Sequence, residues 1–185
     1  VVPGGQQYEE HDNISDQFHF AYNESTDHNT GKVDAICKRP LSDPLIFHTQ
    51  TSTEYWQRRG SLVHTDTKGN DLAPPENVRI YHWASAQHVG NPLQERPTRG
   101  ICQNPENVLQ TSMIIRALLD ALDNWVSKAI TPPENQIPTN YKGTLVDFKY
   151  WKSQFPKIPN LSTPQAPNKL SIYDYGPKAD LGIFD

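Results

Sequence analysis

Two short apolar runs stand out in a chain that is otherwise rich in polar and turn-forming residues. The first is Leu45–His48, which follows Pro44, a residue that a strand tolerates at its start. The second is Val78–Trp83, which places Val78 and Ile80 on one face and aromatic residues on the other, the two-residue period typical of a strand. We therefore predict a β-strand in each run.

A short helical pattern and two turn signals lie around these strands. Ser52 or Thr53 can cap a helix from about Glu54 to Leu62, directly after the first strand. Polar turn-forming residues gather in Asp27–Lys32 and in Thr67–Asp71, and each of these stretches predicts a turn.

The clearest helical pattern follows the second strand. Asn104 can serve as its N-cap and Pro105 as its first residue, and an apolar stripe of helical period continues as far as Val126. Thr131-Pro132-Pro133 ends this pattern. Farther on, Gly143–Val146 is a candidate short strand within a Pro-rich tail.

Strands that alternate with helices indicate an α/β fold. We divide the chain into three parts. A polar segment at 1–44 is typical of a lid or insertion, 45–130 forms the α/β core with both strands and the long helix, and 131–185 is a Pro-rich extension that packs on the core through its aromatic residues.

Composition and charge narrow the classes of function. The chain has 185 residues, of which 35% are hydrophobic, so it can bury one modest core as one domain or part of a larger one. The formal net charge is -4 and no basic block occurs, which argues against nucleic acid as a partner. No apolar run approaches the roughly 18 residues of a membrane span. Because Val1-Val2-Pro3 lacks an initiating Met, we expect a processed product or a truncated piece.

The cysteines and the glycosylation triplets are relevant to the cellular location of the protein. Cys37 and Cys102 could form one disulfide bond or remain thiols, and the sequence does not decide between these states. Asn13, Asn23 and Asn160 each begin an N-x-S/T triplet, which permits glycosylation of a secreted protein. We expect a secreted or extracytoplasmic location, with the cytoplasm as the alternative.

His88 and Glu54 are the main candidates for acid–base chemistry, because each follows a predicted strand. A loop histidine can take a proton from a nucleophilic serine and return it to the leaving group, since the imidazole pKa lies near neutral. A carboxylate can accept the second imidazole N–H and stabilise the cation. The alternative is an ordinary loop histidine and a first-turn glutamate favoured by the helix dipole.

Three other arrangements could carry chemistry. Asp66 is a rival to Glu54 as the acid, although it follows a helix rather than a strand. Cys102 could act as a nucleophile, although no helix begins directly after it. A zinc site would draw on His48, His64, Asp66, His82 and His88. No HExxH motif or clustered pair with metal-ligand spacing occurs, so we expect no metal and no cofactor.

Several longer motifs resemble a known family. They are Thr51–Trp56, Gly60–Asp66, Val78–Tyr81, Gln87-His88, Cys102–Pro105, Leu118–Val126, Pro132-Pro133 and Gly143–Val146. In this order, from about Asn23 to Val146, they are similar to the C-terminal part of the alpha/beta hydrolase domain family of serine hydrolases. The resemblance implies the last strands and final helix of an α/β-hydrolase sheet, and an esterase-type acyl transfer.

The resemblance also assigns roles. His88 matches the catalytic histidine of the family, and Glu54 sits where the triad acid is expected. The family carries its nucleophile and oxyanion hole in an N-terminal half, and no G-x-S-x-G turn occurs in this sequence. We therefore expect a chain that is inactive alone and supplies acid and base to a serine on a separate or cleaved N-terminal half, with a small ester as substrate. The alternative is a non-catalytic, hydrolase-derived binding or structural subunit.

Overall fold

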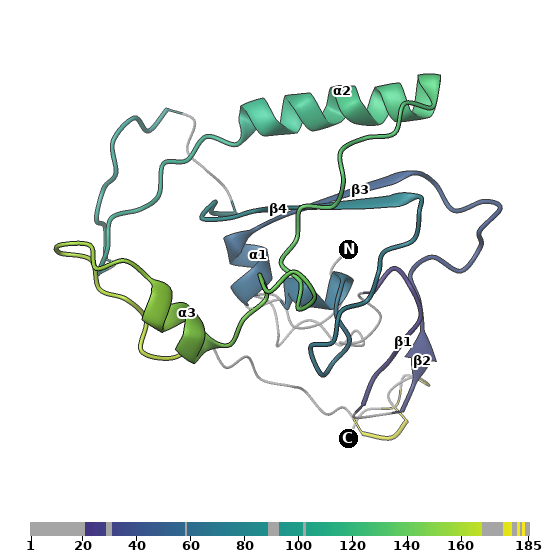
Figure 1. Ribbon diagram of the computed structural model, residues 1–185, viewed down its shortest axis with the longest axis horizontal. Helices are drawn as coiled ribbons and strands as arrows, with labels where there is room; N and C mark the ends of the chain where they lie inside the picture. The colour runs from purple at the N-terminus through teal and green to yellow at the C-terminus, as the bar shows by residue number, and fades with distance from the viewer. Residues whose placement is uncertain are drawn as a thin grey trace. The chain divides into compact units, whose positions relative to one another are not determined.

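The structure of this chain is a computed structural model, which describes residues 21–28, 31–57, 59–88, 93–101, 103–167, 176–178, 181 and 183. In chain order the elements are β1 (Ser25–Thr26), β2 (Val33–Asp34), β3 (Ile46–Thr51), α1 (Ser52–Gln57), the 3₁₀-helix η1 (Gly60–Val63), β4 (Val78–Trp83), α2 (Ser112–Lys128) and α3 (Phe148–Gln154) (Figure 1). The described residues fall into two compact units. The first unit draws on 1–46, 54–78 and 168–185, and the second on 47–53 and 79–167. The division at 44 and 130 stays a prediction.

The first unit contains a small antiparallel hairpin in which β1 pairs with β2. The amide of Asp27 donates to the carbonyl of Lys32 at 2.8 Å, and the amide of Gly31 donates to the carbonyl of Asp27 at 2.7 Å. Gly31 has a φ of 74°, a left-handed value that glycine adopts without a steric penalty. The predicted turn at Asp27–Lys32 is therefore confirmed at its described residues.

β3 and β4 form a two-stranded sheet. Where the strands begin, the amide of Ile46 donates to the carbonyl of Asn77 at 2.8 Å, and just past their ends the amide of Ser52 donates to the carbonyl of Ala86 at 3.1 Å. Since equivalent ends meet, the two strands run parallel. Helices and parallel strands together confirm the predicted α/β class.

Sequence patterns predicted the two strands to different extents. The strand at Val78–Trp83 is confirmed with its predicted bounds. β3 begins one residue later than predicted, at Ile46, and continues to Thr51. Its last two residues, Gln50 and Thr51, are polar yet only 3% and 7% exposed, so hydrophobicity alone could not reveal them.

α2 packs on the sheet through aromatic side chains of the second unit, and Figure 1 shows it running along β3 and β4. The ring of Phe47 lies 5.7 Å from that of Trp125 and 5.2 Å, edge to face, from that of Tyr81. The guanidinium carbon of Arg79 lies 5.1 Å from the Trp125 ring centre, within cation–π range. Ile80, which alternates with these residues along β4, is fully buried.

α2 begins at Ser112, so the prediction of a helix from Pro105 is wrong over its first part. The side-chain oxygen of Asn107 accepts the amide of Leu109 at 2.9 Å, a local bond that competes with helix formation. The side-chain amide of Asn107 also donates to the carbonyl of Ser85. None of the helices in the described ranges has the length and apolar character needed to cross a bilayer.

The predicted strand at Gly143–Val146 is also wrong, because this segment belongs to a turn. The amides of Thr144 and Leu145 both donate to the carbonyl of Thr139, at 3.0 and 2.9 Å. Gly143 adopts a φ of 64°, which the tight reversal needs.

Candidate functional site

The N-terminus of α1 is capped in a way that leaves two hydroxyl groups for other partners. Thr51 Oγ1 accepts the amide of Thr53 at 3.2 Å, which satisfies one of the amides that have no partner within the helix. Thr51 is therefore the cap, and the prediction that Ser52 or Thr53 caps a helix beginning near Glu54 is wrong. The hydroxyls of Ser52 and Thr53 accept bonds from outside the helix instead.

Three hydrogen bonds attach the loop after β4 to the first two residues of α1. The amide of Ser52 donates to the carbonyl of Ala86 at 3.1 Å, and the amide of Ser85 donates to Ser52 Oγ at 2.8 Å. The amide of His88 donates to Thr53 Oγ1 at 3.2 Å. All of these residues belong to the second unit. The backbone of His88 is thereby fixed at the C-terminal end of the parallel strand pair.

Ser85 takes an uncommon backbone conformation in this loop. Its φ is 65°, in the left-handed region that costs a non-glycine residue about 1–2 kcal/mol. The side-chain amide of Asn107 donates to the Ser85 carbonyl, and the neighbouring Ala86 is 2% exposed. Such conformations persist where the surroundings determine them, and they gather at functional sites.

His88 is exposed at the end of this loop, and Glu54 lies half-buried in the first turn of α1. His88 belongs to the second unit and Glu54 to the first. Contact between the two side chains therefore stays a prediction. The residue that the His88 backbone contacts, Thr53, immediately precedes Glu54 in the sequence.

Asp66, the rival acid, organises a turn in the first unit. Its Oδ1 accepts the amides of Lys68 and Asn70, both at 2.8 Å, and its Oδ2 accepts Nδ2 of Asn70 at 2.7 Å. Burial alone would raise the pKa of this carboxyl, but these hydrogen bonds lower it below its usual value of 3.8. The predicted turn at Thr67–Asp71 is confirmed, and Asp66 has a structural role in it.

The sequence also suggested a zinc site and two cysteines with possible chemistry. Among the residues that the structure describes, no three His, Cys, Asp or Glu side chains gather where they could hold a metal ion. Cys37 has a free thiol, and burial together with the Asp43 carboxylate raises its pKa, which disfavours the reactive thiolate. Cys102 lies outside the described residues, so its nucleophilic role stays a prediction. Of the two states left open for Cys37, the structure has the free thiol and not the disulfide bond.

The three glycosylation triplets differ in what the structure describes of them. Asn13 lies outside the described residues, and Asn23 and Asn160 are both exposed. The side-chain amide of Asn23 donates to the carbonyl of Ala73. Glycosylation at these positions stays a prediction.

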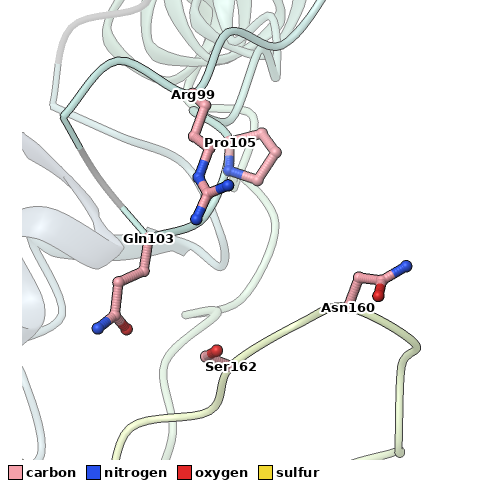
Figure 2. Close-up of a pocket in the computed structure, with 5 residues that line it drawn as sticks. All are labelled: Arg99, Gln103, Pro105, Asn160 and Ser162. Carbon is pink, nitrogen blue, oxygen red and sulfur yellow. The ribbon is translucent and has the colours of Figure 1, made fainter.

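Sequence reasoning did not find a polar cleft in the second unit (Figure 2). It has a volume of ≈ 470 Å³ and is lined by Arg99, Gln103, Pro105, Asn160 and Ser162. Residues from two segments far apart in the chain form it, so no local motif could have signalled it.

A family model matches most of the chain. The model described as Alpha/beta hydrolase domain matches residues 10–154, a range that includes β3, α1, β4, His88 and α2. Neither the curated proteins nor the solved structures contain a match to the chain.

Proposed function

This chain belongs to the alpha/beta hydrolase domain family, and on that premise we propose that it supplies the histidine and the acid of a serine carboxylic-ester hydrolase. The observation that carries the proposal is the bond from the His88 amide to Thr53 Oγ1, at 3.2 Å. This bond keeps the histidine at the carboxyl end of the parallel strands, where open α/β sheets bind their ligands. Glu54 follows Thr53 and orients the imidazole.

The nucleophile in this proposal is a serine on another polypeptide segment, the N-terminal half of the same hydrolase. His88 accepts the serine proton as the serine oxygen attacks the ester carbonyl carbon, and then gives that proton to the departing alcohol. The acyl group stays on the serine until a water molecule, deprotonated by His88, attacks it; the acyl–serine bond breaks, a carboxylic acid leaves, and His88 returns the proton to the serine oxygen. Glu54 accepts the second imidazole N–H and stabilises the cation formed in both steps.

Two features of the second unit support the proposal that another polypeptide segment packs against it. A parallel pair of strands is a small sheet, and parallel sheets are normally covered on both faces and contain further strands. None of the residues of α2, all of which are described, is buried, and Met113, Leu119 and Val126 are 64%, 63% and 66% exposed. A segment that brings further strands and the serine would cover this apolar surface.

Labelling with a fluorophosphonate probe tests the proposal, because the probe reacts with an activated serine. The native material is labelled, and mass spectrometry identifies the modified peptide and its chain. We expect a labelled serine on a co-purifying chain, with labelling lost in His88→Ala and kept in His28→Ala, another exposed histidine. Absence of label from every chain would overturn the proposal and favour a non-catalytic, hydrolase-derived subunit.

A further inference from the structure

Two side chains hold the backbone of Ser85, which comes three residues before His88 in the same loop. The amide of Ser85 donates to Ser52 Oγ at 2.8 Å, and the side-chain amide of Asn107 donates to the carbonyl of Ser85. Both backbone polar groups of Ser85 are therefore engaged. All four residues belong to the second unit, so the arrangement lies within one compact part of the chain.

The side chain of Asn107 is held at both ends of its amide. Its Oδ1 accepts the amide of Leu109 at 2.9 Å, which is the two-residue spacing of an Asx-turn, and this leaves Nδ2 as the donor toward Ser85. The residue before it is anchored as well, because the amide of Glu106 donates to the carbonyl of Thr98 at 2.7 Å. Asn107 is exposed to solvent, but its orientation does not depend on a single bond.

Two departures from local preference meet in the bond between Asn107 and Ser85. Ser85 has a left-handed φ of 65°, which a serine adopts only at a steric cost. Residues 105–111 stay outside α2, although Asn104-Pro105 is a favourable helix start. Overridden local preferences are expected mainly at functional or strained sites. Here one contact carries both departures, and the loop that it holds leads to the proposed catalytic histidine.

We propose that Asn107 is a positioning residue for the hydrolase reaction, because it holds the loop at 85–88 in the conformation that presents His88 to the serine. This inference rests on the proposed function, in which the base must be held in place. Asn107 Nδ2 prevents Ser85 from relaxing to an ordinary negative φ, so the bond from the His88 amide to Thr53 Oγ1 stays aligned. Both hydrogen bonds of the Asn107 side chain go to backbone atoms, so it acts through His88 and not on the ester.

Amide hydrogen exchange in the chain alone tests this role without the serine-bearing segment. Asn107→Asp keeps the oxygen of the local turn but replaces the Nδ2 donor with a second oxygen. We expect the protection factors of the Ser85 and His88 amides to fall about fivefold to tenfold, because one hydrogen bond is lost. The amide of His82, which donates to a neighbouring segment at 2.9 Å, should keep its wild-type protection.

Three further substitutions separate positioning from a general loss of stability. Asn107→Ser has a hydroxyl that can accept in the turn but is too short to reach Ser85, and it serves if Asn107→Asp does not fold. In the matched control Asn124→Ala, which removes a bond to the Asp120 carbonyl within α2, His88 protection should match wild type. Ser85→Gly removes the steric drive out of the left-handed region, so Asn107→Asp should lower His88 protection less than about twofold in that background.

The assembled enzyme supplies a second readout. With a small p-nitrophenyl ester, kcat of Asn107→Asp should fall roughly tenfold with KM nearly unchanged, because a misplaced base slows the chemistry and not the binding. Wild-type protection of His88 in both Asn107 variants, an equal loss at His82, or an unchanged kcat would overturn the positioning role. Absence of ester hydrolysis by wild type would overturn the proposed function, an outcome that the exchange data distinguish from a failure of the Asn107 bond.

Discussion

The backbone amide of His88 donates to Oγ1 of Thr53 at 3.2 Å, across a sequence separation of 35 residues. Thr53 is the second residue of α1, and Glu54 follows it. One hydrogen bond thus fixes the backbone of the proposed catalytic histidine to the sequence neighbour of the proposed acid. Thr53 is a positioning residue in this account, because its hydroxyl contacts backbone and not substrate.

Removal of the Thr53 hydroxyl should loosen His88. Thr53→Val keeps the shape but has no acceptor, so amide hydrogen exchange at His88 should become faster in the chain alone. In the assembled enzyme, kcat/KM for a small ester should fall roughly tenfold, with most of the loss in kcat. Thr53→Ser retains a hydroxyl acceptor, so its amide exchange at His88 and its kcat/KM should both stay close to the wild-type values. Unchanged exchange at His88 in Thr53→Val would show that the bond does not position the histidine.

The left-handed conformation of Ser85 should make glycine a better residue there. Glycine adopts the φ of 65° without the steric cost, although it loses more entropy on folding. We expect Ser85→Gly to raise the free energy of unfolding by about 0.5–1 kcal/mol, measured by urea denaturation. Ser85→Ala keeps the strain and should bring no such gain. A less stable Ser85→Gly would contradict this view of the loop.

Asp66 should stabilise the fold in a pH-dependent manner without affecting catalysis. Because its folded pKa lies below the ordinary 3.8, the stabilisation is complete above that value and is lost as the pH falls through the folded pKa. Asp66→Ala should therefore unfold at lower urea concentration near pH 7, and the difference from wild type should shrink near pH 3 or below. An equal difference between Asp66→Ala and wild type at both pH values would refute the structural role of the Asp66 carboxylate. A loss of turnover in Asp66→Ala comparable to that in Glu54→Gln would instead identify Asp66 as the acid.

Tyr55 should make the fold sensitive to alkali. It is 5% exposed and stacks on His64 with 5.8 Å between ring centres, and burial, with a smaller effect of Asp71, raises its pKa to about 12. A raised pKa means that stabilisation is complete below the unfolded value of 10.0 and declines as the pH rises toward about 12. Tyr55→Phe removes this titration. Its free energy of unfolding should fall less than that of wild type across this range, and an equal fall in both would contradict the argument.

Sequence patterns predicted correctly those elements in which the buried residues are also the apolar ones. β4 was found with its bounds because its fully buried Ile80 alternates with aromatic residues. The prediction of the long helix was wrong over 105–111, because Asn107 bonds locally to Leu109 and across to Ser85 instead of within a helix. A favourable N-cap and proline therefore did not suffice to start α2.

α3 escaped prediction although its signals are present in the sequence. Asp147 is its N-cap, and Oδ1 of that residue accepts the amide of Tyr150 at 2.7 Å. Phe148, Trp151 and Phe155 follow at helical spacing, and adjacent rings in this series lie 5.4 and 4.9 Å apart. The surrounding prolines obscured this pattern.

The site was predictable only in part, for a geometric reason. His88 could be placed in a loop after a strand, because both features are local. Its bond to Thr53 depends on the register of β3 against β4, which no local pattern encodes. The cleft beside Arg99 likewise depends on the contact between Asn104 and Ser162, which are 58 residues apart.

The most direct test of the account is the rate of ester hydrolysis by the assembled enzyme after substitution of His88. Wild type, His88→Ala and the control His28→Ala are compared with a small p-nitrophenyl ester. Because the proposed base takes part in both acylation and deacylation, kcat should fall by roughly three orders of magnitude or more in His88→Ala alone. An assembly that hydrolyses the ester at the wild-type rate without the His88 imidazole would contradict the central claim.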